Sequence, residues 1–227
     1  MSEFQRFSLK YVNANMYLLV EGEKALMIDP FCSEEAMAQL RAAGVQELAI
    51  LLTHEHFDHI SGVNWFKSAF CTQVIAQRAC AEYIADSRNN IPWTFFALMS
   101  PEAKGREKEV EAFCDALPVE AIEVDVAFDD AYDFQWEGHR LHLYARPGHS
   151  PGSMVIELDD EYIFSGDYMI LDLPVLLRLP GGSKKAYKQH TLPYLLALEG
   201  HYKIMPGHGE PYLADGLKYE GDIFTKS

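Results

Sequence analysis

Apolar positions along the chain form short strand-like runs that alternate with helical stretches. Residues 16–20 and 25–28 are apolar runs on either side of a short polar turn, a pattern typical of a β-hairpin. A serine and two glutamates at residues 33–35 predict the start of a helix that ends at Gly44. Residues 48–52 are continuously apolar and predict a buried strand.

The alternation of strands and helices continues through the rest of the chain, with a strand-rich region that extends to about residue 166. The linkers are short and no stretch is rich in serine and glycine, so residues 1–227 are expected to form a single domain of the α/β class. Helices are predicted over residues 62–69, 77–86, 105–116 and 184–198, with a strand at 72–76 and a short helix near the C-terminus.

Metal-ligand chemistry is concentrated directly after the strand predicted at residues 48–52. His54, His56, Asp58 and His59 occupy four of six consecutive positions there. Imidazole nitrogen and carboxylate oxygen are the ligands that zinc and similar cations prefer. A tight loop at a strand end directs alternate side chains to different sides, so His54 and His56 are expected to face one way and Asp58 and His59 another. This pattern favours two adjacent metal ions over one.

Further ligand candidates follow later strand patterns. His149 lies on a Gly/Pro loop after residues 140–144, Asp167 follows an apolar strand pattern, and His208 stands in the sequence Pro-Gly-His-Gly. Each pattern consists of an apolar strand, a small or turn residue and then the ligand. Glycine next to a ligand lets the backbone approach closely, because no Cβ is in the way.

The order of these motifs resembles the metallo-β-lactamase superfamily. Asp29, in the sequence Met-Ile-Asp-Pro, matches its first motif, and the histidine-rich segment at residues 54–59 matches its second. His149, Asp167 and His208 match the third, fourth and fifth motifs. The resemblance implies a four-layer αββα sandwich, in which two mixed β-sheets are flanked by helices.

The resemblance also implies how the ligands are shared. Two zinc ions are expected as cofactors, with iron and manganese as alternatives, because all three accept imidazole and carboxylate ligands. One ion is assigned to His54, His56 and His149, the second to Asp58, His59 and His208, and Asp167 bridges both.

Two adjacent cations can share a water molecule and lower its pKa towards neutrality, which predicts hydrolysis by a metal-bridging hydroxide. Asp58 is the candidate catalytic residue, because its carboxylate can hydrogen-bond that hydroxide while it ligates a metal. Asp29 is a candidate to orient a ligand histidine from outside the ligand set. The alternative for Asp29 is a structural role at the start of a turn.

The turn Pro-Gly-Gly-Ser at residues 180–183 resembles short glyoxalase II-like (hydroxyacylglutathione hydrolase-like) thioesterases. Arg178 and Lys184, near this turn, are candidates to bind an anionic substrate, and Tyr168, next to Asp167, is a candidate either to donate to an oxyanion of the substrate or simply to pack. Only residues 209–227 follow His208, so the helical domain that binds glutathione in long glyoxalases is not expected.

Three functions remain open from the sequence. The first is a dinuclear hydrolase of a small ester, thioester or lactone, with a glyoxalase II-like thioesterase as its most specific form. The second is an iron-dependent persulfide dioxygenase-like oxidoreductase with one metal. The third, a non-catalytic module with a structural metal, ranks last, because closed structural sites fill every position with protein ligands.

The composition of the chain argues against some classes of binding partner. A net charge of −15 and a pI near 4.9 argue against nucleic acid, which requires a basic surface. No apolar run reaches membrane-spanning length, and no basic segment followed by an apolar one begins the chain. A cytoplasmic enzyme with a small-molecule substrate is therefore expected, with neither nucleic acid nor membrane as a partner. Residues 87–105 are aromatic-rich and predict either a lid over the metals or a packing contact, including one in a homodimer.

Overall fold

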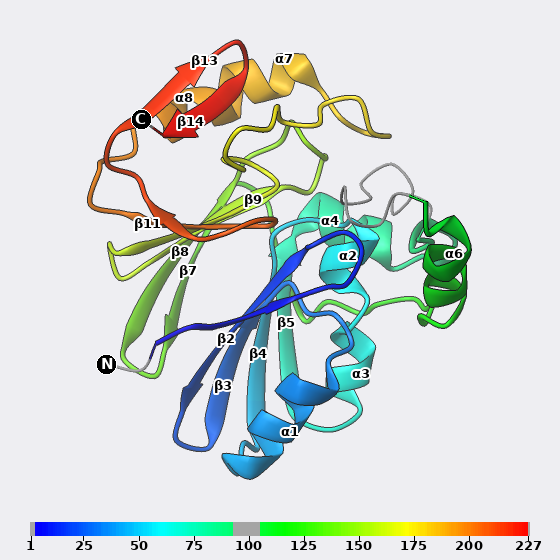
Figure 1. Cartoon of the computed structure of the whole chain (residues 1–227). Helices are drawn as coiled ribbons and strands as arrows, with labels where there is room; N and C mark the ends of the chain where they lie inside the picture. Colours follow the sequence, from blue (N-terminus) through cyan, green and yellow to red (C-terminus); the bar gives the residue numbers. More distant parts are fainter. Residues whose placement is uncertain (1–2, 93–104, 227) are drawn as a thin grey trace.

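The computed structural model describes residues 3–92 and 105–226, and two six-stranded sheets form its centre (Figure 1). The first sheet is antiparallel from β1 to β3 and parallel from β3 to β6, so it is mixed. Its strands, in spatial order, are β1 (Gln5–Ser8), β2 (Asn15–Glu21), β3 (Lys24–Ile28), β4 (Glu47–Leu52), β5 (Cys71–Gln77) and β6 (Val126–Phe128).

The second sheet is also mixed, because β10 and β11 are parallel and the other pairs are antiparallel. Its spatial order is β12 (Tyr212–Leu213), β11 (Lys203–Pro206), β10 (Tyr162–Gly166), β9 (Met154–Leu158), β8 (His139–Ala145) and β7 (Ala131–Trp136).

Helices cover the outer face of each sheet (Figure 1). The first sheet carries α1 (Glu34–Ala42), α2 (Phe57–Ile60), α3 (Val63–Lys67), α4 (Arg78–Ile84), a 3-10 turn at Ser87–Asn89 and α6 (Glu107–Asp115). The second carries α7 (Lys184–Ala186), a π-helical turn at Tyr187–Thr191, α8 (Leu192–Leu196) and the hairpin of β13 (Leu217–Glu220) and β14 (Ile223–Lys226). The expected four-layer αββα arrangement is therefore confirmed.

The continuous apolar runs of the central strands reflect burial on both faces. In β2, Tyr17 and Leu19 lie in the cluster between the two sheets, whereas Met16 and Leu18 pack under the helices. Successive strand side chains point to opposite faces, so every position of such a strand must be apolar. The Tyr17 and Phe164 rings join the two sheets, with centroids 5.3 Å apart and an edge-to-face geometry.

Most predicted elements are present, and one is wrong. The short C-terminal helix is absent, because residues 217–226 form the β13–β14 hairpin. Its turn consists of Gly221 and Asp222, both at positive φ (61° and 66°), a conformation typical of a two-residue hairpin turn. The alternation of Leu217 and Tyr219 with polar residues follows the period of a strand.

The predicted helix at 184–198 is divided by the π-helical turn, and β1 was not predicted from the sequence. The aromatic residues Trp93, Phe95, Phe96 and Met99 lie outside the described residues, so the lid and packing interpretations of 87–105 both remain predictions. None of the helices in the described ranges has the length and apolar character that crossing a membrane requires.

Candidate metal centre

All seven predicted ligands lie together, at the edge where loops from both sheets meet. His54 follows β4, His149 lies between β8 and β9, Asp167 follows β10 and His208 follows β11. Their donor atoms form two groups, each with all atoms within 4.8 Å of one another, and His54 and His59 form a third such group with Asp29. The first group is His54, His56, His149 and Asp167, and the second is Asp58, His59 and His208.

Asp167 stands between the two groups. Its Oδ2 lies 3.3 Å from His149 Nε2 and 3.9 Å from His54 Nε2 in the first group. Its Oδ1 lies 3.3 Å from His59 Nε2 and 3.4 Å from His208 Nε2 in the second. One carboxylate therefore presents one oxygen to each group, which is the arrangement that a bridging ligand requires.

Each group also has short internal distances. His56 directs its Nδ1 at His149 Nε2, 2.9 Å away. Asp58 Oδ2 lies 3.5 Å from His59 Nε2 and 3.4 Å from His208 Nε2.

Several of these inward-facing atoms are buried and have no hydrogen-bond partner. An unpaired buried polar atom costs about 1–3 kcal/mol, so such a concentration needs an explanation. Cations that accept nitrogen and oxygen donors would satisfy all of them together, and the donor set fits a dinuclear site. The unpaired atoms are His54 Nε2, both Asp58 oxygens, His59 Nε2, Asp167 Oδ1 and His208 Nε2.

Asp29 orients two of the histidines from outside the ligand set. Its Oδ2 accepts from His59 Nδ1–H at 3.0 Å and from the Thr53 hydroxyl at 2.6 Å, and its Oδ1 accepts from the Thr53 N–H at 2.7 Å. Since the Thr53 hydroxyl donates to Asp29, its oxygen is free to accept from His54 Nδ1–H, 3.0 Å away. Both rings are thereby held with Nε2 towards the metal site. Thr53 was not predicted from the sequence.

Backbone carbonyl groups orient two further histidines. His149 Nδ1–H donates to Leu176 O at 2.8 Å, and His208 Nδ1–H donates to Val12 O at 2.9 Å. Every residue carries a carbonyl group, so no sequence signal marks these two acceptors. The Nε2 atoms of both rings again remain directed at the carboxylates.

Glycine permits the strand ends to approach one another. Gly166 has φ +53°, and a Cβ there would lie 2.9 Å from Thr53 Oγ1. At Gly207 a Cβ would lie 2.5 Å from Asp167 Oδ1. A larger residue at Gly207 would meet Asp167 directly, and one at Gly166 would meet Thr53, which holds His54.

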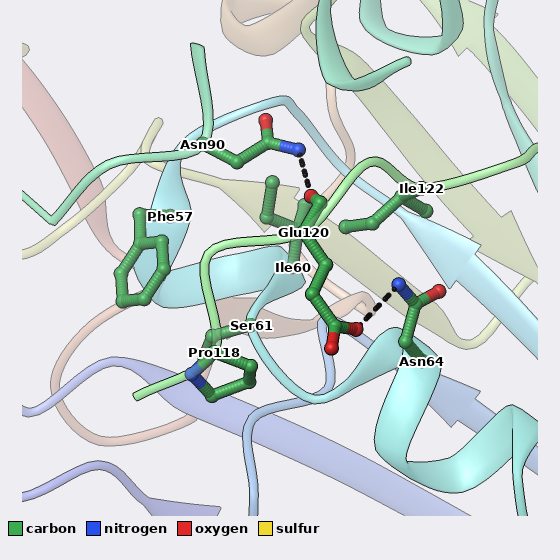
Figure 2. Close-up of a pocket in the computed structure, with 8 residues that line it drawn as sticks. All are labelled: Phe57, Ile60, Ser61, Asn64, Asn90, Pro118, Glu120 and Ile122. Atoms are coloured by element: carbon green, nitrogen blue, oxygen red, sulfur yellow. Dashed lines mark hydrogen bonds between the residues drawn. The ribbon is translucent and has the colours of Figure 1, made fainter. Parts of the chain in front are cut away.

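A small pocket borders the short helix α2, which carries Asp58 and His59. Asn64 Nδ2 donates to Glu120 Oε2 at 2.9 Å, and Asn90 Nδ2 donates to Glu120 O at 2.7 Å (Figure 2). Phe57 and Ile60 of α2 line this pocket, which is shown in Figure 2, and none of its lining residues is a predicted ligand. Its lining residues are Phe57, Ile60, Ser61, Asn64, Asn90, Pro118, Glu120 and Ile122.

The histidines of the first group favour the neutral form. Burial is the main cause, and it lowers the pKa of His54, of His56 and of His149, the last to about 4. Neutral imidazole is the form that binds a metal ion, so these rings are ready to do so at neutral pH.

The second group behaves in the opposite way. Burial would lower the pKa of His59 and of His208, but the carboxylates of Asp58 and Asp167 outweigh it and raise both, that of His208 to about 10. Burial would raise the pKa of the two carboxyl groups, but the two imidazoles hold each below its usual range. Without a cation, this group therefore pairs imidazolium with carboxylate.

The positions of the predicted substrate-binding residues support their predicted role less well than the positions of the predicted ligands support metal binding. Tyr168 is 1% exposed, and its hydroxyl donates to Arg146 O (2.6 Å) and accepts from the His149 N–H (2.9 Å). Its hydroxyl therefore holds the His149 loop, which agrees with a packing role, and substrate binding by Tyr168 stays a prediction. Lys184 is exposed and paired with Asp222 at 3.0 Å, and Arg178 is exposed.

Comparison with known proteins agrees with this architecture. The model of the metallo-beta-lactamase superfamily matches residues 10–208. A probable metallo-hydrolase, YqgX, of Bacillus subtilis is 25% identical over 209 residues, which cover 91% of this chain and 90% of that protein. A hydroxyacylglutathione hydrolase of Anaeromyxobacter dehalogenans is 27% identical over 91% of this chain, but the match spans only 66% of its length.

Solved structures show the same fold. BLEG-1, described as a B3 metallo-beta-lactamase, superimposes with a TM-score of 0.71 at 22% identity, and the match covers 93% of this chain and 94% of that one. The protein TTHA1623, solved in a di-iron-bound form, gives a TM-score of 0.68 at 26% identity, with 92% and 94% covered.

Replacement of Asp29 by asparagine is expected to weaken metal binding about 10- to 100-fold, because an outer carboxylate that orients a ligand histidine is lost. The measurement is metal retained after dialysis against graded chelator concentrations. Asp159→Asn is the matched control, since Asp159 also bonds a histidine, His139 at 2.5 Å, that is not a predicted ligand. An equal loss of metal in both variants would contradict the orienting role.

The two ligand groups are expected to differ in proton release when they bind a metal at pH 7. A raised pKa keeps His59 and His208 protonated until pH exceeds it, so a cation must displace their protons and its affinity falls as pH decreases. His149, with a pKa of about 4, releases none at pH 7. Calorimetric titration in buffers of different ionisation enthalpy measures the protons released at each step. Equal proton release in both steps would contradict this asymmetry.

Proposed function

Since the chain belongs to the metallo-beta-lactamase superfamily of metal-dependent hydrolases, we propose that it hydrolyses a small ester, thioester or lactone at a centre of two metal ions. The supporting observation is the pair of buried donor groups that share Asp167. A substrate with a good leaving group needs no strong general acid, which suits a site composed almost entirely of metal ligands.

Two cations held by these residues would supply an acidic water molecule and would polarise the carbonyl group of the substrate. The residues of the chain supply position and proton transfer. Asp58 is the proposed proton acceptor, because both of its oxygens are buried without a hydrogen bond and the imidazoles of His59 and His208 hold its pKa below the usual range, against the effect of burial. Its carboxylate is therefore ionised at neutral pH and can take a proton from the attacking water.

A pocket beside His56 is the proposed position for one end of the substrate. Its lining residues are Glu55, His56, Phe57, Tyr83, Asn89, Ile91 and Pro180. Arg178 is the proposed partner for an anionic group of the substrate, because it is exposed and arginine matches carboxylate geometry. Lys184 is a weaker candidate because Asp222 already pairs with it.

A thioester is the proposed substrate class to examine first. The similarity to hydroxyacylglutathione hydrolase supports this choice, although this chain matches only 66% of that protein's length. Zinc is the proposed metal, and iron is the main alternative, because the similar protein TTHA1623 was solved with two irons.

Metal analysis of the purified protein, followed by a screen of thioesters, lactones and phosphoesters, tests the proposal. We expect about two zinc ions per chain and turnover of a thioester, lost on chelation and restored by zinc. A single iron with oxygen uptake on a persulfide would instead establish the dioxygenase alternative. Stable binding of metal without turnover of any substrate would contradict an enzymatic role.

Replacement of Asp58 by asparagine is expected to lower kcat about 10²- to 10⁴-fold at saturating metal, because the proton acceptor is removed. The metal content of the assayed sample must be measured at the same time, so that loss of a ligand is separated from loss of the proton acceptor. The control is Asp133→Asn, an exposed carboxylate paired with His142, which should retain full activity. A D58N variant with full activity would exclude the proposed role.

A further inference from the structure

Glu55 lies between two predicted ligands in the chain, yet its side chain bonds to a different loop. It is 3% exposed and lies in none of the donor groups. We propose that Glu55 is a positioning residue that fixes the loop of His149 against the loop of His54 and His56, and so sets the geometry of the first metal site. This inference rests on the proposed dinuclear centre.

Two hydrogen bonds connect Glu55 to the loop that follows His149. Its Oε2 accepts from the Ser150 hydroxyl at 2.8 Å, and its Oε1 accepts from the Gly152 N–H at 3.2 Å. The loop is also closed on itself, since the Ser150 N–H donates to Ser153 Oγ at 3.1 Å. The Glu55 carboxylate thus forms hydrogen bonds to two positions of this compact turn.

The packing around this contact leaves no space for a side chain at position 152. A Cβ at Gly152 would lie 2.5 Å from Glu55 Oε2 and 2.4 Å from the backbone nitrogen of Cys80. The glycine therefore permits the backbone of the turn to reach the carboxylate directly. The same close approach presses the turn against α4, so the turn has a fixed position relative to the first sheet.

A bond between the two loops matters at the first metal site because of His56. In the described part of the chain, the ring of His56 has no hydrogen bond to a residue outside the ligand set. His54 is held by Thr53, and His149 is held by Leu176 O. Among the described residues, the only hydrogen-bond contact of the His56 ring is the one with His149, at 2.9 Å. The position of His56 relative to His149 therefore depends on the contacts between the two loops. Glu55 provides such a contact, because it is adjacent to His54 and His56 in the chain and bonds to Ser150, the residue next to His149.

Stepwise titration of the metal-free protein with Co²⁺, followed by its visible absorption, measures the two sites separately. A His149→Ala variant identifies the step that belongs to the first site, because that step is lost. Glu55→Ala is expected to weaken this step about 10- to 100-fold, as the loss of outer hydrogen bonds to a metal site does. The step that belongs to Asp58, His59 and His208 should not change.

Three further variants separate positioning from simple packing. Glu55→Gln retains an oxygen for the Gly152 N–H and an amide that can donate to Ser150 Oγ, so it should restore wild-type affinity. Ser150→Ala removes the bond to Glu55 and also the 2.8 Å contact between Ser150 Oγ and Ser153 Oγ, so it should weaken the first step at least about fivefold, the equivalent of one ordinary hydrogen bond. Cys80→Ala is the matched control, because it opens space beside the same turn without removing either bond.

Equal weakening of both steps in E55A, or the same weakening in C80A, would show a general packing effect and overturn the inference. Unchanged titration of E55A would overturn it as well. Uptake of fewer than two ions by the wild-type protein would be a failure of the proposed centre itself. If E55A does not fold, S150A still decides, since an unchanged first step in that variant contradicts the role of Glu55.

Discussion

The burial of two carboxylates without hydrogen bonds to their inner oxygens is the constraint on which the rest of the centre depends. Asp58 and Asp167 are 1% and 5% exposed, and removal of such groups from water is costly unless an opposite charge is close. Nearby imidazoles supply that charge in the second group, and cations would supply it across both groups. The surrounding elements, from α2 to the Gly166 and Gly207 strand ends, hold the charges at these distances.

The fold class and the ligand set could be predicted from sequence because both have local signals. Continuous apolar runs such as residues 48–52 indicate strands buried on both faces, and this is their environment in the sheet. The histidines and aspartates follow these strands within a few residues, so their convergence at one edge could be inferred from spacing. The predicted outer residue Asp29 lies where its motif placed it, against His59.

The remaining parts depend on contacts between distant segments or on groups that every residue has. Val12 O and Leu176 O hold two histidines, but a carbonyl group has no signature in the sequence. Glu55 looks like a spacer within a ligand motif, and only the position of Gly152 gives it a role. Tyr168 follows a ligand directly, which suggested either a contact with substrate or packing, and its hydroxyl joins Arg146 O to the His149 backbone.

The two ligand groups differ in how they reduce the free-energy cost of burying polar and charged side chains. This difference explains how the site can form before a metal ion binds. The first group consists mainly of neutral rings, so without a cation its burial costs less than burial of the same number of charged groups would. The second holds the carboxylate of Asp58 against two imidazoles whose raised pKa lets them carry positive charge. In the absence of a metal ion, the positive charge of these protonated rings balances the carboxylates as the second cation would. Asp167 faces both groups, so a cation in either changes the field at the other, and the two ions should be coupled through this one carboxylate.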